Sequence, residues 1–255
     1  MNFENTRYNR QLMMPEWGAE GQKRVAQATV GVVGAGGVKS TLLMALAACG
    51  VGSIRFCEFD QVEVSNLNRQ CLYSTGDIGI PKGLAAQKFL RQLNPEVCIE
   101  WRDARITSDN IDEHFAAVDI VVEGGDSPLN RNAVNDYCLR ASKPMVHASA
   151  QYSYGYVCSV CPDACTACLA CFFPDEIQRG ESTGPVPVNV LSVQLAGTLG
   201  AAEVLKWILG YRDQMYVNGR FCFSSLLLSG CFEMRPQVRR PDCPICGPIY
   251  RSRGR

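Results

Sequence analysis

The chain has 255 residues, of which 47% are hydrophobic and 20% charged, and its 25 basic side chains balance 25 acidic ones. This composition predicts one packed α/β domain, and the zero net charge argues against nucleic acid or a membrane surface as the main partner. No apolar run is long enough to cross a membrane, and the polar N-terminus is unlike a signal peptide. We therefore expect a cytoplasmic protein.

Short apolar strands alternate with helical segments, which predicts a Rossmann-like, doubly wound α/β sheet that is parallel in its first half. After residue 145 the alternation weakens. Segments 221–228 and 230–236 are expected to pair antiparallel around Ser229 and Gly230, so the second half of the sheet is expected to be antiparallel. The other expected strands are 29–33, 53–59, 97–103, 119–124, 144–150 and 155–160; the expected helices are 18–27, 39–49, 82–93, 108–116, 129–141 and 192–209; and 172–188 is expected to be a long loop.

Three close glycines, Gly34, Gly36 and Gly37, stand between an apolar strand and a helix in GVVGAGGVKS. Glycine permits a sharp turn and a close approach to a ligand, and the helix N-terminus that follows offers free N–H groups to phosphate. Glu58 ends the second strand segment about 20 residues later, where a carboxylate can bind a ribose hydroxyl. The pattern predicts a nucleotide-binding βαβ unit.

Two cations follow this unit, Arg69 in SNLNRQ and Lys82 after Ile80-Pro81. An enzyme that attacks a triphosphate needs such cations, because arginine binds two phosphate oxygens at once and lysine acts as a point charge. The dehydrogenase fingerprint lacks its third glycine, since Lys39 stands there, which disfavours a nicotinamide or flavin. Lys39 either adds charge near the phosphates or points to solvent. Asp60 either contacts the nucleotide or only ends its strand.

These motifs resemble the ThiF/MoeB/HesA family, the bacterial relatives of ubiquitin-activating enzymes, over nearly the whole chain. The family implies an ATP-dependent adenylyltransferase that activates a C-terminal carboxylate as acyl-AMP and releases pyrophosphate. A carboxylate is already a nucleophile, so positioning, fixed cations and Mg²⁺ would supply most of the catalysis. The resemblance rests on RYNRQ (7–11), GAGG (34–37), SNLNRQ (65–70), PK (81–82), the Asp126 region, and C-x-x-C pairs at 168–171 and 243–246.

The resemblance assigns roles to single residues. Asp126 matches the Mg²⁺-binding aspartate of the family, and the alternative is that it caps the following helix. Arg10 matches an arginine that reaches the neighbouring subunit's ATP site, which implies a homodimer with shared sites. The expected catalytic residues are Arg10, Arg69, Lys82 and Asp126, and the expected nucleotide ligands are Gly34, Gly36, Gly37, Glu58, Asp60, Asn66, Arg69 and Lys82.

Fourteen cysteines include several C-x-x-C pairs. Two thiolates at this spacing can hold one tetrahedral ion, and a second pair completes a Cys₄ site. Cys243 and Cys246 form the clearer half. Spacing leaves the other half open between Cys158–Cys161, Cys165–Cys168 and Cys168–Cys171, and the family frame favours Cys168 and Cys171. Because four thiolates leave no open position, we expect a small structural zinc site.

We expect one adenylation domain over 1–255, with an N-terminal helical arm at 1–28, an ATP-binding half at 29–150 and an acceptor-binding half with the zinc site at 151–255. The family implies an acceptor that is a ubiquitin-like sulfur-carrier protein. Alternatives are a peptide or small acid of natural-product biosynthesis, or a catalytically silent docking subunit. Several relatives carry a reactive cysteine near the place of Thr183, and no cysteine occurs between Cys171 and Cys222. We therefore expect the chain to stop at the acyl-adenylate.

Overall fold

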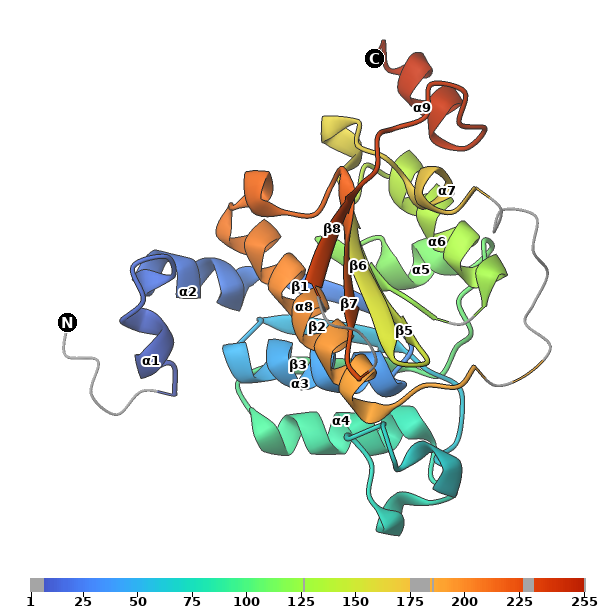
Figure 1. Ribbon diagram of the computed structural model, residues 1–255. Coiled ribbons are helices and arrows are strands. Elements are labelled where there is room, and N and C mark those ends of the chain that lie inside the picture. The colour runs from blue at the N-terminus through green and yellow to red at the C-terminus, as the bar shows by residue number, and fades with distance from the viewer. Residues whose placement is uncertain (1–6, 126, 175–183, 185, 227–231, 255) are drawn as a thin grey trace.

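The structure, a computed structural model, describes residues 7–125, 127–174, 184, 186–226 and 232–254, and it is built on one eight-stranded sheet (Figure 1). The strand order is β3-β2-β1-β4-β5-β6-β7-β8. Strands β1 to β5 pair in parallel, and β5 to β8 pair antiparallel. The strands are β1 (Thr29–Val33), β2 (Ser53–Cys57), β3 (Cys98–Arg102), β4 (Ile120–Glu123), β5 (Met145–Gln151), β6 (Tyr154–Val160), β7 (Gly219–Ser224) and β8 (Phe232–Pro236).

The order in which the chain adds strands reverses at β1: β2 and β3 lie on one side of it, and β4 and β5 lie on the other. In register, Val32 pairs with Phe56 of β2 on one side and with Val122 of β4 on the other. Strand β4 is buried along its whole length, as expected of a parallel strand that is covered on both faces. In an open α/β sheet, ligands bind beyond the carboxyl ends of the strands at such a switch point.

Helices cover both faces of the sheet, and a separate hydrophobic cluster lies under each of the two sets of helices. One cluster joins β1 and β2 to α3, α4 and α8, and the other lies under α5, α6, α7 and α9. Gly197 lets α8 approach α3 closely, because a Cβ there would lie 2.4 Å from the Val38 carbonyl oxygen. The helices are α1 (Asn9–Leu12), α2 (Gly18–Gln27), α3 (Gly37–Cys49), α4 (Lys82–Leu93), α5 (Ile111–Phe115), α6 (Pro128–Arg140), α7 (Leu169–Phe172), α8 (Val190–Leu209) and α9 (Cys246–Ser252).

The N-terminal helices α1 and α2 project from one side of the sheet (Figure 1). Arg24 of α2 donates to the carbonyl of Leu209 at the end of α8 (2.8 Å), and the Tyr211 hydroxyl donates to Glu16 O (2.8 Å). These contacts fasten the arm to α8. Within the described ranges, no helix has the length and apolar character that crossing a membrane requires.

The mixed sheet expected from the sequence is confirmed, including the antiparallel pairing of β7 with β8. Ser229 and Gly230, expected at that turn, and most of the loop expected at 172–188 lie outside the described residues. The alternative interpretation of Asp126, as the cap of the following helix, is wrong by one position. Helix α6 is capped by Ser127, whose side chain accepts the backbone N–H of Asn130, and Pro128 is its first residue, which favours this start.

Candidate active site and cysteine cluster

A cavity of about 480 Å³ opens at the carboxyl ends of β1, β2 and β4, at the switch point of the sheet. The sequence-predicted nucleotide residues come from three separate segments of the chain, and the structure brings all of them to the wall of this one cavity. They are Gly34, Gly36, Gly37, Glu58, Asp60, Asn66, Arg69 and Lys82.

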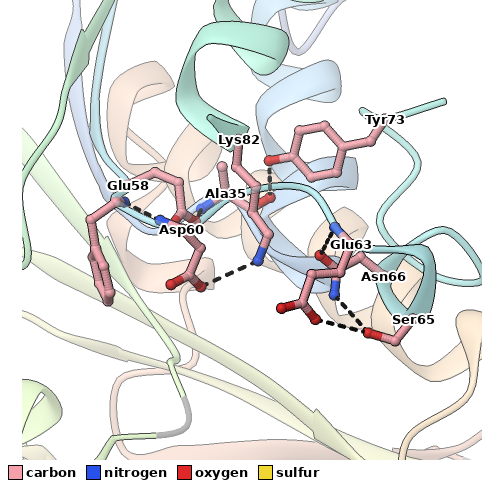
Figure 2. Close-up of polar contacts among 9 residues, drawn as sticks. Ala35, Glu58, Asp60, Glu63, Ser65, Asn66, Tyr73 and Lys82 are labelled. Carbon is pink, nitrogen blue, oxygen red and sulfur yellow. Dashed lines mark hydrogen bonds and ion pairs between the residues drawn. The ribbon is translucent and has the colours of Figure 1, made fainter. Parts of the chain in front are cut away.

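The glycine loop that forms one wall is held in shape from three sides. Gly34 has a φ of +83°, in the left-handed region, and its N–H donates to Cys57 O (2.8 Å). The Ala35 N–H donates to Glu58 Oε2 (2.8 Å), and the Tyr73 hydroxyl donates to Ala35 O (2.8 Å), as Figure 2 shows. The first turn of α3 then begins at the cavity, where its N–H groups lack helical partners and suit an anion.

Glu58 organises the loops on both sides of the cavity. The residue is 5% exposed, and Oε1 accepts the N–H groups of Phe59 (2.8 Å) and Asp60 (3.0 Å), while Oε2 accepts that of Ala35. A carboxylate has roughly four lone-pair sites, so three are occupied and about one remains for a ribose hydroxyl. The longer side chain of glutamate thus ties the glycine loop to the loop after β2.

Lys82 reaches the same cavity from the first residue of α4. Its side chain is 8% exposed, and Nζ lies 3.2 Å from Asp60 Oδ2, an ion pair visible in Figure 2. The Asp60 carboxyl is 53% exposed. A buried ammonium is therefore paired with a carboxylate that solvent or a ligand can reach.

Asn66 and Arg69 lie on the next loop. Asn66 Oδ1 accepts the Glu63 N–H (3.1 Å) and so caps the short 3₁₀ turn Val64–Asn66, which makes it a capping residue as well as a lining residue. Arg69 also lines the cavity, and its Nη1 donates to Ser65 O (2.8 Å) and to Asn68 Oδ1 (2.9 Å).

Two buried polar residues of the cavity wall were missed or left open by the sequence. Lys39 is only 4% exposed and lies in the cavity wall, where Nζ donates to Ala148 O (3.4 Å), so its interpretation as a solvent-facing charge is wrong. Gln70 is 6% exposed, and its Oε1 has no hydrogen-bond partner among the described residues. Its place directly after Arg69 in SNLNRQ was the available signal.

The other two predicted catalytic residues are Arg10 and Asp126. Arg10 lies exposed on α1 and is absent from the residues that line the cavity. Asp126 lies outside the described residues, although its neighbours Gly125 and Ser127 line the cavity.

A second feature is a buried cluster of four thiols contributed by α7, its N-cap, the segment before α9 and the first residue of α9. The Sγ atoms lie 3.9 Å apart for Cys168–Cys171, 3.8 Å for Cys168–Cys243 and 3.7 Å for Cys171–Cys246. Four sulfurs at about 2.3 Å from one tetrahedral Zn²⁺ would be about 3.8 Å apart. The cluster, whose Sγ atoms all lie within 4.8 Å of one another, is therefore compatible with such an ion. The ambiguity in the first cysteine pair is resolved in favour of 168 and 171.

The fold and the cavity define a class: a Rossmann-like α/β protein in which a glycine loop, Arg69 of a second loop and Lys82 at the start of α4 line one cavity at the switch point of the sheet. The description "ThiF family" matches residues 8–245, and the chain belongs to the ThiF family. It is an adenylyltransferase.

Three curated relatives match along most of the length of both chains. The sulfur carrier protein adenylyltransferase of Thermus thermophilus is 39% identical over 254 residues, which are 96% of this chain and 91% of that one. The SAMP-activating enzyme E1 of Haloferax volcanii is 37% identical over 244 residues, 94% of this chain and 88% of the relative. The HesA protein of Leptolyngbya boryana is 31% identical over 248 residues, 96% and 86% of the two chains.

Solved structures show the same fold. Escherichia coli MccB with ATP superimposes with a TM-score of 0.82 at 28% identity, covering 96% of this chain and 74% of that one. The microcin C7 biosynthetic enzyme MccB in complex with N-formylated MccA gives a TM-score of 0.82 at 25% identity, covering 96% and 76%.

Proposed function

We propose that this adenylyltransferase uses ATP to activate the C-terminal carboxylate of a ubiquitin-like sulfur-carrier protein. The carrier's carboxylate oxygen forms a bond to the α-phosphorus, the bond from that phosphorus to the pyrophosphate oxygen breaks, and acyl-AMP and pyrophosphate result. The observation that carries the proposal is the convergence of the glycine loop, Arg69 and Lys82 on one cavity. The names of the relatives from Thermus thermophilus and Haloferax volcanii support the class of acceptor.

The charged and polar groups of the cavity would each contact a different part of ATP. The first turn of α3 offers N–H groups to phosphate oxygens. Lys82 and Arg69 would take the negative charge that shifts toward pyrophosphate as it leaves, the kind of fixed electrostatic stabilisation that contributes most in a cavity shielded from water. Asp60, now paired with Lys82 at 3.2 Å, would exchange that partner for a nucleotide hydroxyl. Glu58 would hold the loops in register throughout.

We further propose that Asp126 holds Mg²⁺ beside the phosphates. A hard cation in a phosphate site prefers one or two carboxylates together with phosphate oxygens. The ion would neutralise phosphate charge and assist the departure of pyrophosphate. Gly125 and Ser127, the residues on either side of Asp126 in the sequence, line the cavity, which supports the proposal.

The active protein is proposed to be a homodimer in which Arg10 enters the neighbouring subunit's cavity. Arg10 is exposed on α1, and the described residues that line its own subunit's cavity do not include it. The domain would then consist of the arm at 1–28, the ATP-binding half at 29–150 and the acceptor-binding half at 151–255.

The four-cysteine cluster is proposed to hold a structural zinc ion. Four thiolates would fill the coordination shell, so the ion would stabilise the packing of α7 against α9 and would take no part in adenylation. Reduced thiolates and ATP both suit the cytoplasm, where we place the protein.

The chain is proposed to stop at the acyl-adenylate. Burial raises the pKa of Cys158, and it raises that of Cys161 to about 11, so both thiols are poor nucleophiles at neutral pH. Thr183 lies outside the described residues. A hydroxyl there cannot hold a persulfide. Intact mass spectrometry after incubation with ATP and carrier should show no reductant-sensitive adduct on this chain; such an adduct on Cys158, Cys161 or Cys165 would contradict the proposal.

The likeness to the microcin C7 biosynthetic enzyme MccB favours one alternative acceptor, a peptide or small acid of natural-product biosynthesis. The two acceptors are separated by incubating the protein with Mg-ATP and either a carrier protein ending in Gly-Gly or a set of short peptides. Intact mass should show a gain of one AMP on the carrier and none on a carrier with an amidated C-terminus. If short peptides are adenylated and the carrier protein is not, the acceptor is a peptide and the proposed carrier is wrong.

A further inference from the structure

Two buried side chains that the proposed function leaves unused lie beside the nucleotide cavity. Glu123 ends β4 and His147 lies opposite it on β5, as register partners of the parallel pair. Both are fully buried, and His147 Nδ1 lies 2.8 Å from Glu123 Oε2. Burying a carboxylate costs folding free energy unless its oxygens accept hydrogen bonds, so we asked which structural role this buried pair serves.

The other oxygen of Glu123 reaches the segment that lines the cavity. Glu123 Oε1 accepts the N–H of Gly125 at 2.9 Å, and Gly124 and Gly125 both belong to the cavity wall. Gly124 has a φ of +142°, and a Cβ there would lie 1.9 Å from the Ala148 carbonyl oxygen and 2.8 Å from Lys39 Nζ. Gly124 is thus confined by β5 and α3, and the direction of the next peptide depends on Glu123.

Charge in this cluster is arranged so that Glu123 accepts and His147 donates. Burial opposes ionisation of Glu123, but the hydrogen bond from His147 and the nearby cations Lys39 and Arg131 outweigh it and lower the carboxyl pKa. Burial lowers the pKa of His147 and keeps the ring neutral. A neutral ring beside an ionised carboxylate carries its proton on Nδ1. The ring is also stacked on Tyr156, with centroids 5.5 Å apart, which fixes its orientation.

We propose that Glu123 and His147 are positioning residues for adenylation: the carboxylate fixes the Gly124–Gly125 wall of the cavity, and the imidazole fixes the carboxylate. The inference rests on the proposed function, because the reaction it serves is the one proposed for this cavity. Neither residue touches a reacting atom. Both act by holding the wall within the tolerance of the reaction, where a displacement of about 1 Å can cost about 10²-fold in rate.

The chain contains a matched control for the loss of a buried carboxylate. Glu203 on α8 is also fully buried, accepts hydrogen bonds from Ser159 Oγ and the Tyr216 N–H (both 2.7 Å), and pairs with Lys206. It is absent from the cavity wall. Glu203→Ala should therefore lower the melting temperature as Glu123→Ala does, without displacing the wall.

The experiment measures kcat, the KM for ATP and the KM for the carrier in acceptor-dependent ATP–pyrophosphate exchange, with rates expressed per folded protein. Glu123→Ala should lose about 10²-fold in kcat with little change in the carrier KM, whereas Glu203→Ala should stay near the wild-type kcat. His147→Phe, which keeps the stacked ring but removes the donor, should lose more activity than His147→Asn, which restores an N–H donor near Nδ1. Wild-type kcat in Glu123→Ala, or an equal loss in Glu203→Ala, would overturn the proposal.

If Glu123→Ala does not fold, Glu123→Gln and His147→Phe decide the question, and wild-type kcat in both would overturn it. Failure of the proposed function has a different signature, because the wild-type protein would then show no exchange with any carrier. In that case calorimetry with Mg-ATP still tests the positioning. We expect weaker binding by Glu123→Ala than by Glu203→Ala, and equal affinities would refute the role.

Discussion

Replacing Lys82 by alanine should reduce exchange by about 10²-fold, the scale found when one electrostatic stabiliser is removed. The ammonium is 8% exposed, so solvent screens it only partly. Unit charges about 4 Å apart attract by about 4 kcal/mol at an effective dielectric constant near 20. Since each 1.36 kcal/mol corresponds to about tenfold in rate, this sets an upper bound of roughly 10³-fold. Stability should change little, because the partner Asp60 is half exposed and such pairs contribute about 0–1 kcal/mol.

The assay is carrier-dependent exchange of labelled pyrophosphate into ATP, with Lys88→Ala as the matched control. Lys88 lies on the same helix, α4, and is exposed outside the cavity wall. Lys82→Arg should recover part of the lost rate, because the charge returns with a different geometry. If Lys82→Ala matches Lys88→Ala in kcat/KM while remaining folded, Lys82 does not stabilise the reacting phosphates and the assignment of the cavity is refuted.

Three further outcomes follow from the structure. Metal analysis should find about one zinc per chain, and Cys246→Ser should release it and lower the melting temperature, whereas zinc-free wild-type protein purified under reducing conditions would contradict the cluster's role. Inactive Arg10→Ala and Asp126→Ala chains should restore activity when mixed, because one site in a mixed dimer keeps both groups; no recovery after proven subunit exchange would place Arg10 outside the neighbour's site. The folded state lowers the pKa of His147, so as the pH falls the unfolded chain takes up a proton on this side chain before the folded protein does. The free energy of unfolding should therefore fall as the pH drops below about 6.5, and it should fall less steeply in His147→Phe. Equal slopes of the two proteins between pH about 7 and about 5.5 would contradict the buried neutral ring.

The sheet was predictable because its strands are short apolar runs with clear helices between them. The expected second strand, 53–59, was too long. Strand β2 ends at Cys57 because the Glu58 side chain accepts the next two backbone N–H groups and bends the chain into the cavity loop. The helix expected from 108 begins only at Ile111, since Asn110 Oδ1 accepts the Thr107 N–H in a turn. Local side-chain bonds of this kind leave little trace in apolar periodicity.

The residues that meet in the cavity wall were predictable from motifs, but their interactions were not. Glu123 and His147 are 24 positions apart and become neighbours only when β4 pairs with β5. The sequence placed Lys39 at the first turn of its helix. Its burial, however, depends on Gly124 and on Ala148 of β5, which lies 109 positions later in the chain and is brought close by the parallel sheet. Contacts that depend on strand order cannot be derived from spacing along the chain.

The central claim, adenylation of a carrier's C-terminal carboxylate, is tested most directly by exchange of labelled pyrophosphate into ATP with and without carrier. We expect Mg²⁺-dependent exchange that requires a carrier ending in a free Gly-Gly carboxylate and that stops when this carboxylate is amidated. The contradicting result would be no exchange by folded wild-type protein with free-carboxylate carriers or peptides, or exchange at the same rate with the amidated carrier.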